Sequence, residues 1–278
     1  MPGLVLEGGT FRPIFSSGVM DALLEHGMMF DYVIGVSAGI ADGVSYLSRQ
    51  KGRNLDILLN YRHDKRYIGM RNFLHCKSLF GLDFVYGEIP DKLIPFDWKA
   101  FHEYKGTALA GVTNATTGKT EYFDCRYMDA KFQILRATCA IPLVFPPVFI
   151  DGKPYYDGGL LDPIPIRKAI QDGQEKLMVV LTRPKGYRKE LKAQNRLAAR
   201  RLRKKYPELE PVLLNRHIAY NETVDFCEQL SEQGKVVLIR PSGPINSLEK
   251  DLDKIQLAYR EGYEMVEQRL SEIEKLFR

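Results

Sequence analysis

The chain has 278 residues, of which 45% are hydrophobic and 27% are charged. These proportions are typical of a globular protein and exclude a disordered chain, a collagen-like fibre and a disulfide-rich miniprotein. The length fits one large α/β domain or one domain with additions. The four cysteines form no CxxC pair, so the sequence indicates neither a disulfide framework nor a zinc site, and we expect reduced thiols and no metal.

The net charge of +5 is concentrated in one segment. Residues 183–205 contain eleven lysines and arginines and a single acid, Glu190, whereas the rest of the chain is net acidic. This distribution argues against a general nucleic-acid-binding protein. Apolar residues recur in the segment near helical spacing, which predicts a helix with basic faces: Tyr187, Leu191, Ala198, Leu202 and Tyr206. Those faces are either simply solvated or attract an anionic membrane surface, and both interpretations stay open.

No apolar run approaches the roughly 18 residues that a membrane span needs, and the first residues show no charged leader or cleavage site. We therefore expect a cytoplasmic protein, which the basic segment could hold at the inner face of the membrane.

Short apolar strands alternate with helical patterns along the chain. Residues 4–6 and 32–36 predict strands, and each is followed by a turn and a helical pattern, the second of which runs through Leu47. Later runs at 107–112, 176–182 and 235–240 have the same buried-strand character, and residues 248–277 predict one long terminal helix. This alternation predicts an α/β fold with three layers, in which helices cover both faces of a mostly parallel sheet.

Periodicity weakens between residues 61 and 104, where ten of the thirty aromatic residues occur. Local packing of an irregular insertion is the preferred interpretation. A lid or the wall of an acyl pocket is compatible with it.

The motif Gly35–Gly39 (GVSAG) fits the pattern G-x-S-x-G and lies directly between a predicted strand and a predicted helix. A serine at such a sharp turn sits in strained backbone, and the small flanking residues Gly35 and Gly39 let the strand and helix approach each other. Its hydroxyl would be exposed at a helix N-terminus, where developing negative charge is favoured. Ser37 is therefore the candidate nucleophile.

A glycine-containing loop, Gly8–Arg12 (GGTFR), follows the first predicted strand. Its N–H groups could converge on the phosphate of a nucleotide or on the oxyanion of an acyl intermediate. Neither nucleotide-binding glycine motif can be laid on these residues, so we favour an oxyanion hole formed by Gly8, Gly9 and Thr10.

The third element is Asp157, which precedes Gly158 and Gly159. An acid before two glycines is often only a turn residue, but a serine nucleophile needs a proton acceptor. No histidine lies in a glycine-rich loop or at an obvious strand end, so a Ser–Asp dyad is favoured, although spacing alone leaves a Ser–His–Asp triad open. Asp162 is the second choice for the base, and its preferred role is to fix the turn before Pro163.

Four segments together resemble the patatin-like phospholipases of the bacterial branch: the loop at Gly8–Arg12, the motif at Gly35–Gly39, the segment Ala137–Pro142 and the turn at Asp157–Gly159. The resemblance covers about two thirds of the chain. It implies a patatin-like fold, a variant of the α/β-hydrolase type, with a catalytic domain at 1–183 and with residues 184–278 adding the basic segment, a strand and a helix to the same domain. It also implies a serine acyl hydrolase for lipid esters that needs no cofactor, with Ser37 as nucleophile and Asp157 as base.

The oxyanion loop departs from the family pattern G-G-G-x-[KR]-G at Thr10 and Pro13. A β-branched residue resists positive φ, and proline lacks an N–H donor, although that loss costs little at a helix start. We therefore keep a second function in view, a catalytically weakened homologue that binds lipid or a protein partner. A nucleotide-binding protein is the third alternative.

Overall fold

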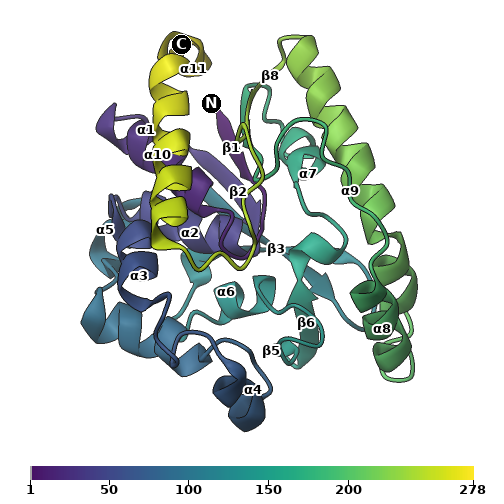
Figure 1. Cartoon of the computed structure of the whole chain (residues 1–278). Coiled ribbons are helices and arrows are strands. Elements are labelled where there is room, and N and C mark those ends of the chain that lie inside the picture. Colours follow the sequence, from purple (N-terminus) through teal and green to yellow (C-terminus); the bar gives the residue numbers. More distant parts are fainter. Residues whose placement is uncertain (1) are drawn as a thin grey trace.

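An eight-stranded mixed sheet runs through the centre of the molecule in the computed structural model, which describes residues 2–278 (Figure 1). Its order is β5–β6–β3–β2–β1–β7–β8, with β4 paired to β3. The strands are β1 (Gly3–Leu6), β2 (Tyr32–Val36), β3 (Thr107–Asn114), β4 (Thr120–Asp124), β5 (Val148–Ile150), β6 (Lys153–Asp157), β7 (Leu177–Val180) and β8 (Val236–Ile239). All five strands predicted from apolar runs are present, and they form the parallel part of the sheet.

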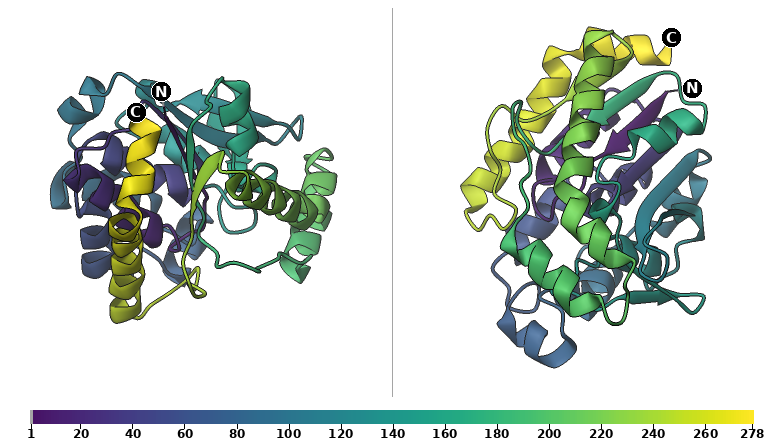
Figure 2. Two further views of the ribbon diagram at one scale, coloured as in Figure 1. Left: turned by 90° about the horizontal axis from the view of Figure 1, so that it is seen from above. Right: turned by 90° about the vertical axis from the view of Figure 1, so that its right-hand side faces the viewer.

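Helices cover both faces of this sheet. They are α1 (Ile14–Glu25), α2 (Ala38–Leu47), α3 (Arg53–Tyr61), α4 (Met70–Cys76), the π-helical segment η1 (Phe84–Leu93), α5 (Trp98–Glu103), α6 (Gln133–Thr138), α7 (Ile166–Gln171), α8 (Ala193–Leu202), α9 (Leu209–Glu232), α10 (Leu252–Gln268) and α11 (Leu270–Glu274). Short 3-10 turns lie at Cys125–Tyr127, Gly158–Leu160 and Lys275–Phe277. Helices α9 and α10 lie on opposite sides of the sheet (Figure 2), so the predicted three-layer α/β architecture is confirmed.

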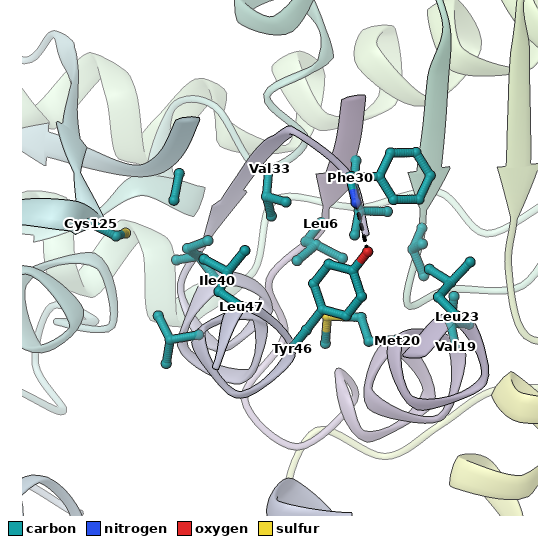
Figure 3. Packing of buried hydrophobic residues seen from close by; sticks show 14 of the residues in the cluster. Leu6, Val19, Met20, Leu23, Phe30, Val33, Ile40, Tyr46, Leu47 and Cys125 are labelled. Atoms are coloured by element: carbon teal, nitrogen blue, oxygen red, sulfur yellow. Dashed lines mark hydrogen bonds between the residues drawn. The ribbon is translucent and has the colours of Figure 1, made fainter. Parts of the chain in front are cut away.

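Alternating residues of the parallel strands divide the core in two. In β1, Leu4 and Leu6 pack into the cluster beneath α1 and α2, whereas Val5 points into the cluster beneath α7 and α9. Figure 3 shows the first cluster, in which Leu6 and Val33 meet residues of the covering helices. Because successive strand side chains point to opposite faces, a fully apolar run is what a strand buried on both faces requires.

The C-terminal helix α10 packs directly on α1. A Cβ atom added at Gly18 would lie 1.9 Å from the carbonyl oxygen of Tyr259, and one at Gly262 would lie 2.0 Å from that of Phe15. Only glycine permits such backbone contact. The last part of the chain is thereby fixed against the first helix.

Two sequence-based expectations need correction, and one part of the sheet was not predicted. The terminal helix is not continuous, because it breaks at Arg269, whose Nη1 donates to the carbonyl oxygen of Leu238 at 2.6 Å. The basic segment is helical only in α8, since residues 183–192, which include Pro184 and a positive-φ Gly186, form a loop. The antiparallel strands β4–β6 were not predicted.

Candidate active site

Ser37 occupies the sharp turn between β2 and α2. Its backbone has φ 54° and ψ −139°, a strained conformation for a residue with a side chain. The N–H of Ser37 donates to Oγ1 of Thr138 at 2.8 Å, and that hydroxyl in turn donates to the carbonyl oxygen of Gly111 at 2.5 Å. Thr138 is fully buried, so this chain of hydrogen bonds holds the strained turn against the sheet.

Two glycines allow the turn to pack closely on the end of β1. A Cβ atom at Gly8 would lie 2.8 Å from the Cβ of Ser37, and one at Gly39 would lie 2.6 Å from the carbonyl oxygen of Glu7. Larger residues would push the loop after β1 away from Ser37. These contacts bring the glycine loop and the motif predicted from sequence into one site.

Asp157 ends β6 and is 4% exposed. Its carboxylate accepts the N–H of Gly159 at 2.7 Å, and its own N–H donates to the carbonyl oxygen of Ala140 at 2.9 Å. Burial raises the pKa of Asp157, while the Ser37 hydroxyl, the positive charge of Arg216 and the Gly159 N–H each lower it in part. A buried carboxylate beside a serine hydroxyl is well suited to accept that proton.

The loop after β1 presents free donors next to Ser37. Among the described residues, the N–H groups of Gly8, Gly9 and Thr10 have no hydrogen-bond partner. Thr10 has φ 58°, so the β-branched residue does adopt the left-handed conformation that glycine would take most easily. Such a row of unpaired donors can receive an oxyanion.

Two cavities meet at Ser37. One has a volume of about 150 Å³ and extends under α2 and the aromatic insertion, where its lining is mostly apolar and includes Tyr67, Phe80, Val85, Tyr86 and Phe96. The other is larger, about 510 Å³, and is lined by Gly8, Gly9, Asp157 and several cationic residues. Ser37 lines both, so an ester bond placed there would have an apolar group on one side and a polar group on the other. Residues 61–104 therefore pack locally and also form part of the wall of the apolar cavity.

The other candidate bases lie elsewhere or have other partners. Asp162 accepts the hydroxyl of Tyr122 and lines neither cavity, which agrees with a structural role. His26 contacts Glu267 at 2.7 Å, and three further histidines are exposed and line neither cavity: His63, His75 and His102. His217 of α9 does line the polar cavity, but its buried Nδ1 has no hydrogen-bond partner among the described residues and so is not linked to Asp157.

Cys139 also reaches the apolar cavity beside Ser37. Burial raises the pKa of its thiol to about 12, so the thiol stays protonated at neutral pH and does not compete as a nucleophile. In the part of the chain that the structure describes, no group of three or more potential ligand side chains could hold a metal ion.

Sequence reasoning missed two residues of this site. Thr138 lies within the segment Ala137–Pro142 that contributed to the resemblance, but its bond to the N–H of Ser37 depends on packing across the sheet. Arg216 of α9 gave no signal, because its Nε meets the carbonyl oxygen of Gly159 only in the folded chain, at 2.8 Å.

Comparison with known proteins agrees with this geometry. The model of the patatin-like phospholipase family matches residues 4–170, which include Ser37, Asp157 and the glycine loop. The chain belongs to the patatin-like phospholipase family. A second family model, a domain of unknown function (DUF6363), matches residues 206–278, from just before α9 to the last residue.

Relatives of this patatin-like chain are distant. Protein YjjU of Escherichia coli is 26% identical over 189 residues, which cover 65% of this chain and 52% of YjjU. Lysophospholipase nte1 of Aspergillus terreus is 26% identical over 180 residues, 59% of this chain but 11% of that protein. The chain thus spans about half of YjjU and a small part of nte1. The crystal structure of VipD from Legionella pneumophila aligns over 97% of this chain and 66% of VipD, with a TM-score of 0.48 and 16% identity.

No helix in the described part of this family member is both long and apolar enough to cross a membrane.

Proposed function

We propose that this protein is a serine acyl hydrolase that cleaves fatty acyl esters of lipids. The observation that carries the proposal is the position of Ser37, which stands in a strained turn beside the buried Asp157 and at the junction of an apolar and a polar cavity. Family membership and the lysophospholipase nte1 among the relatives support a lipid substrate.

The arrangement supports a two-step reaction. Ser37 Oγ attacks the ester carbonyl carbon while Asp157 takes its proton, and the N–H groups of Gly8, Gly9 and Thr10 receive the oxyanion. Asp157 then protonates the leaving alcohol, so that an acyl-enzyme remains. Water attacks the acyl carbonyl, gives its proton to Asp157 and releases the fatty acid, after which the proton returns to Ser37. No step needs a metal or an organic cofactor.

Labelling by a fluorophosphonate tests the nucleophile. We expect labelling of the wild-type chain that disappears in Ser37→Ala, and loss of ester hydrolysis in both Ser37→Ala and Asp157→Asn with folding unchanged. The control is His217→Ala, because His217 is the histidine that shares the polar cavity. An inactive His217→Ala beside an active Asp157→Asn would replace the dyad by a histidine-based mechanism.

Wild-type protein that is not labelled and does not turn over esters would favour the alternative, a weakened homologue that binds lipid or a partner. The observation behind that alternative is Thr10, whose branched side chain occupies a left-handed position in the oxyanion loop.

A further inference from the structure

Five cationic residues line the polar cavity that contains Ser37 and Asp157, of which Lys192 is exposed and the other four are buried or partly buried. Arg12 follows the oxyanion loop, Arg183 and Lys189 belong to the loop after β7, and Arg216 comes from α9. Three separate parts of the chain therefore direct positive charge toward one space beside the nucleophile.

Neutral groups, not carboxylates, hold these side chains. Nε of Arg12 donates to Oγ1 of Thr182 at 3.2 Å, and Nε of Arg216 donates to the carbonyl oxygen of Gly159 at 2.8 Å. The other two lie over aromatic rings, with Arg183 4.3 Å from the ring centre of Tyr187 and Lys189 3.6 Å from that of Tyr220.

None of the four forms an ion pair with a described residue. By contrast, the exposed Arg188 of the same loop pairs with Asp225 at 2.6 Å and with Glu228 at 3.4 Å. The carboxylates that line the cavity are Glu7, Asp157 and Glu190, of which Glu7 already accepts the N–H of Thr182 and Asp157 that of Gly159. The cavity is left with excess positive charge and with N–H donors free to bind.

Burial and the neighbouring positive charges both act on Lys189. Burial lowers the pKa of Lys189 well below its usual value, and the charges of Arg216, Arg12 and Arg183 lower it further against the opposing effect of Glu7. Like charges gathered in a partly buried site cost free energy unless an anion compensates them.

We propose that the polar cavity binds the phosphate of a net-anionic head group, and that the enzyme prefers acyl esters of glycerol phosphate to esters with a zwitterionic choline head group. The proposal rests on the hydrolase function proposed above. Phosphate would take the N–H donors of Arg183, Lys189 and Arg216, while the acyl chain enters the apolar cavity and the ester lies at Ser37.

Choline is disfavoured for two reasons. A quaternary ammonium group would add positive charge to a space that already has an excess of it. In addition, aromatic faces are the groups that bind such a cation best, and the faces of Tyr187 and Tyr220 are already covered by Arg183 and Lys189.

Selectivity is tested with two lysolipids that share one acyl chain, lysophosphatidate and lysophosphatidylcholine, both below their micelle concentration. We expect the wild-type kcat/KM to favour lysophosphatidate by about tenfold or more, since one charge-assisted hydrogen bond can supply that factor. Arg183→Gln and Lys189→Gln should each reduce this ratio, and the double variant should abolish it. The matched control, Arg188→Gln, should keep the wild-type ratio. A wild-type preference for the choline lipid, or a ratio that survives in the double variant, would overturn the proposal.

Binding separates this proposal from the hydrolase function. Titration of Ser37→Ala with an ether-linked lysophosphatidate, which cannot be hydrolysed, should show tighter binding than the ether-linked choline lipid even if no ester is ever turned over. Equal binding of the two ether lipids by a protein that hydrolyses esters would reject the head-group site alone. Inorganic phosphate should compete only weakly, and inorganic phosphate that binds as tightly as the ether lipid would identify a free-phosphate site and overturn the lipid assignment.

Discussion

Arg216 donates a hydrogen bond from Nε to the carbonyl oxygen of Gly159 at 2.8 Å. Gly159 in turn donates its N–H to the carboxylate of Asp157. Helix α9, which lies in the region matched by the domain of unknown function, thereby supports the turn that carries the proposed base. Arg216 is thus a positioning residue for Asp157 as well as a source of positive charge near it.

The acidic limb of the pH–rate profile should report this relationship. Burial raises the pKa of Asp157, and the charge of Arg216 partly offsets that rise. Because the base must be deprotonated, kcat/KM should fall on acidification at a pH above the ordinary aspartate range. Arg216→Gln removes the offsetting charge, so its acidic limb should lie at higher pH than that of the wild type.

Measurement of kcat/KM from pH 4 to 9 on a soluble neutral ester checks the shift. Arg216→Lys serves as the control, because it keeps the charge and should retain most of the wild-type limb. If the acidic limb of kcat/KM lies at the wild-type pH in Arg216→Gln and the rate is reduced equally at all pH values, Arg216 positions Asp157 but its charge does not affect the pKa of Asp157.

Thr10→Gly should stabilise the protein. A non-glycine residue in the left-handed region costs the folded state about 1–2 kcal/mol. Glycine avoids this cost, but its greater freedom in the unfolded chain lowers the free energy of unfolding by about 0.5–1 kcal/mol. With φ 58° at Thr10, we expect a gain of up to about 1 kcal/mol in the free energy of unfolding, measured by urea denaturation.

Turnover of the same variant reports on the oxyanion hole. A rise in kcat with little change in KM would show that the threonine misdirects its N–H, and a fall in kcat would show that this N–H is already aligned. Thr10→Val is the control, since it keeps a β-branched residue and should show neither the gain in stability nor a rise in kcat.

Local patterns predicted the parts of this protein whose geometry is set within a few residues. The turn at Ser37 could be predicted because a buried strand, a small-residue motif and a helix follow one another directly. The same is true of the parallel strands, whose apolar runs match burial on both faces. Strand β4 could not be predicted, because every residue in it is only partly buried and its pairing with β3 sets its position.

Contacts between distant segments explain what remained hidden at the site. Thr138 and Arg216 act through hydrogen bonds to residues far along the chain, and neither stands in a motif that specifies such a partner. The loop at 183–192 looked helical because Tyr187 and Leu191 have helical spacing, yet Pro184 and Gly186 interrupt the backbone there.

Ala41→Phe should shorten the acyl chains that the enzyme accepts. Ala41 lies one turn after Ser37 in α2 and lines the apolar cavity, whose volume of about 150 Å³ is comparable to a cavity that holds benzene. A phenyl group there would fill most of the space. We expect kcat/KM for a dodecanoyl ester to fall by at least about tenfold, while that for an acetyl ester stays within about twofold. An equal loss on both esters would indicate damage to Ser37 rather than a blocked pocket.

The exposed cations around α8 should attach the protein to anionic membranes. This helix lines the polar cavity with Gln194, Asn195 and Ala198. A membrane bound by α8 would therefore lie next to the cavity. Each Lys or Arg near an anionic bilayer contributes on the order of 1 kcal/mol, and the attraction decays over about 8 Å at physiological salt. Five exposed cations, none of which forms an ion pair with a described residue, extend along this region: Arg200, Arg201, Arg203, Lys204 and Lys205.

Reversal of these five residues to Glu should weaken sedimentation with anionic vesicles and lower hydrolysis of lipid in them, while hydrolysis of a soluble short-chain ester stays unchanged. Rising salt should weaken wild-type binding in the same way. The control alters the net charge equally by reversing five exposed cations elsewhere: Lys99, Lys235, Lys254, Arg260 and Lys275. This control variant should bind anionic vesicles much more strongly than the α8 reversal does. Binding that ignores both salt and the α8 reversal would show that α8 is only a solvated helix, and the exposed Met70 and Leu74 of α4 would then be the better lipid contacts.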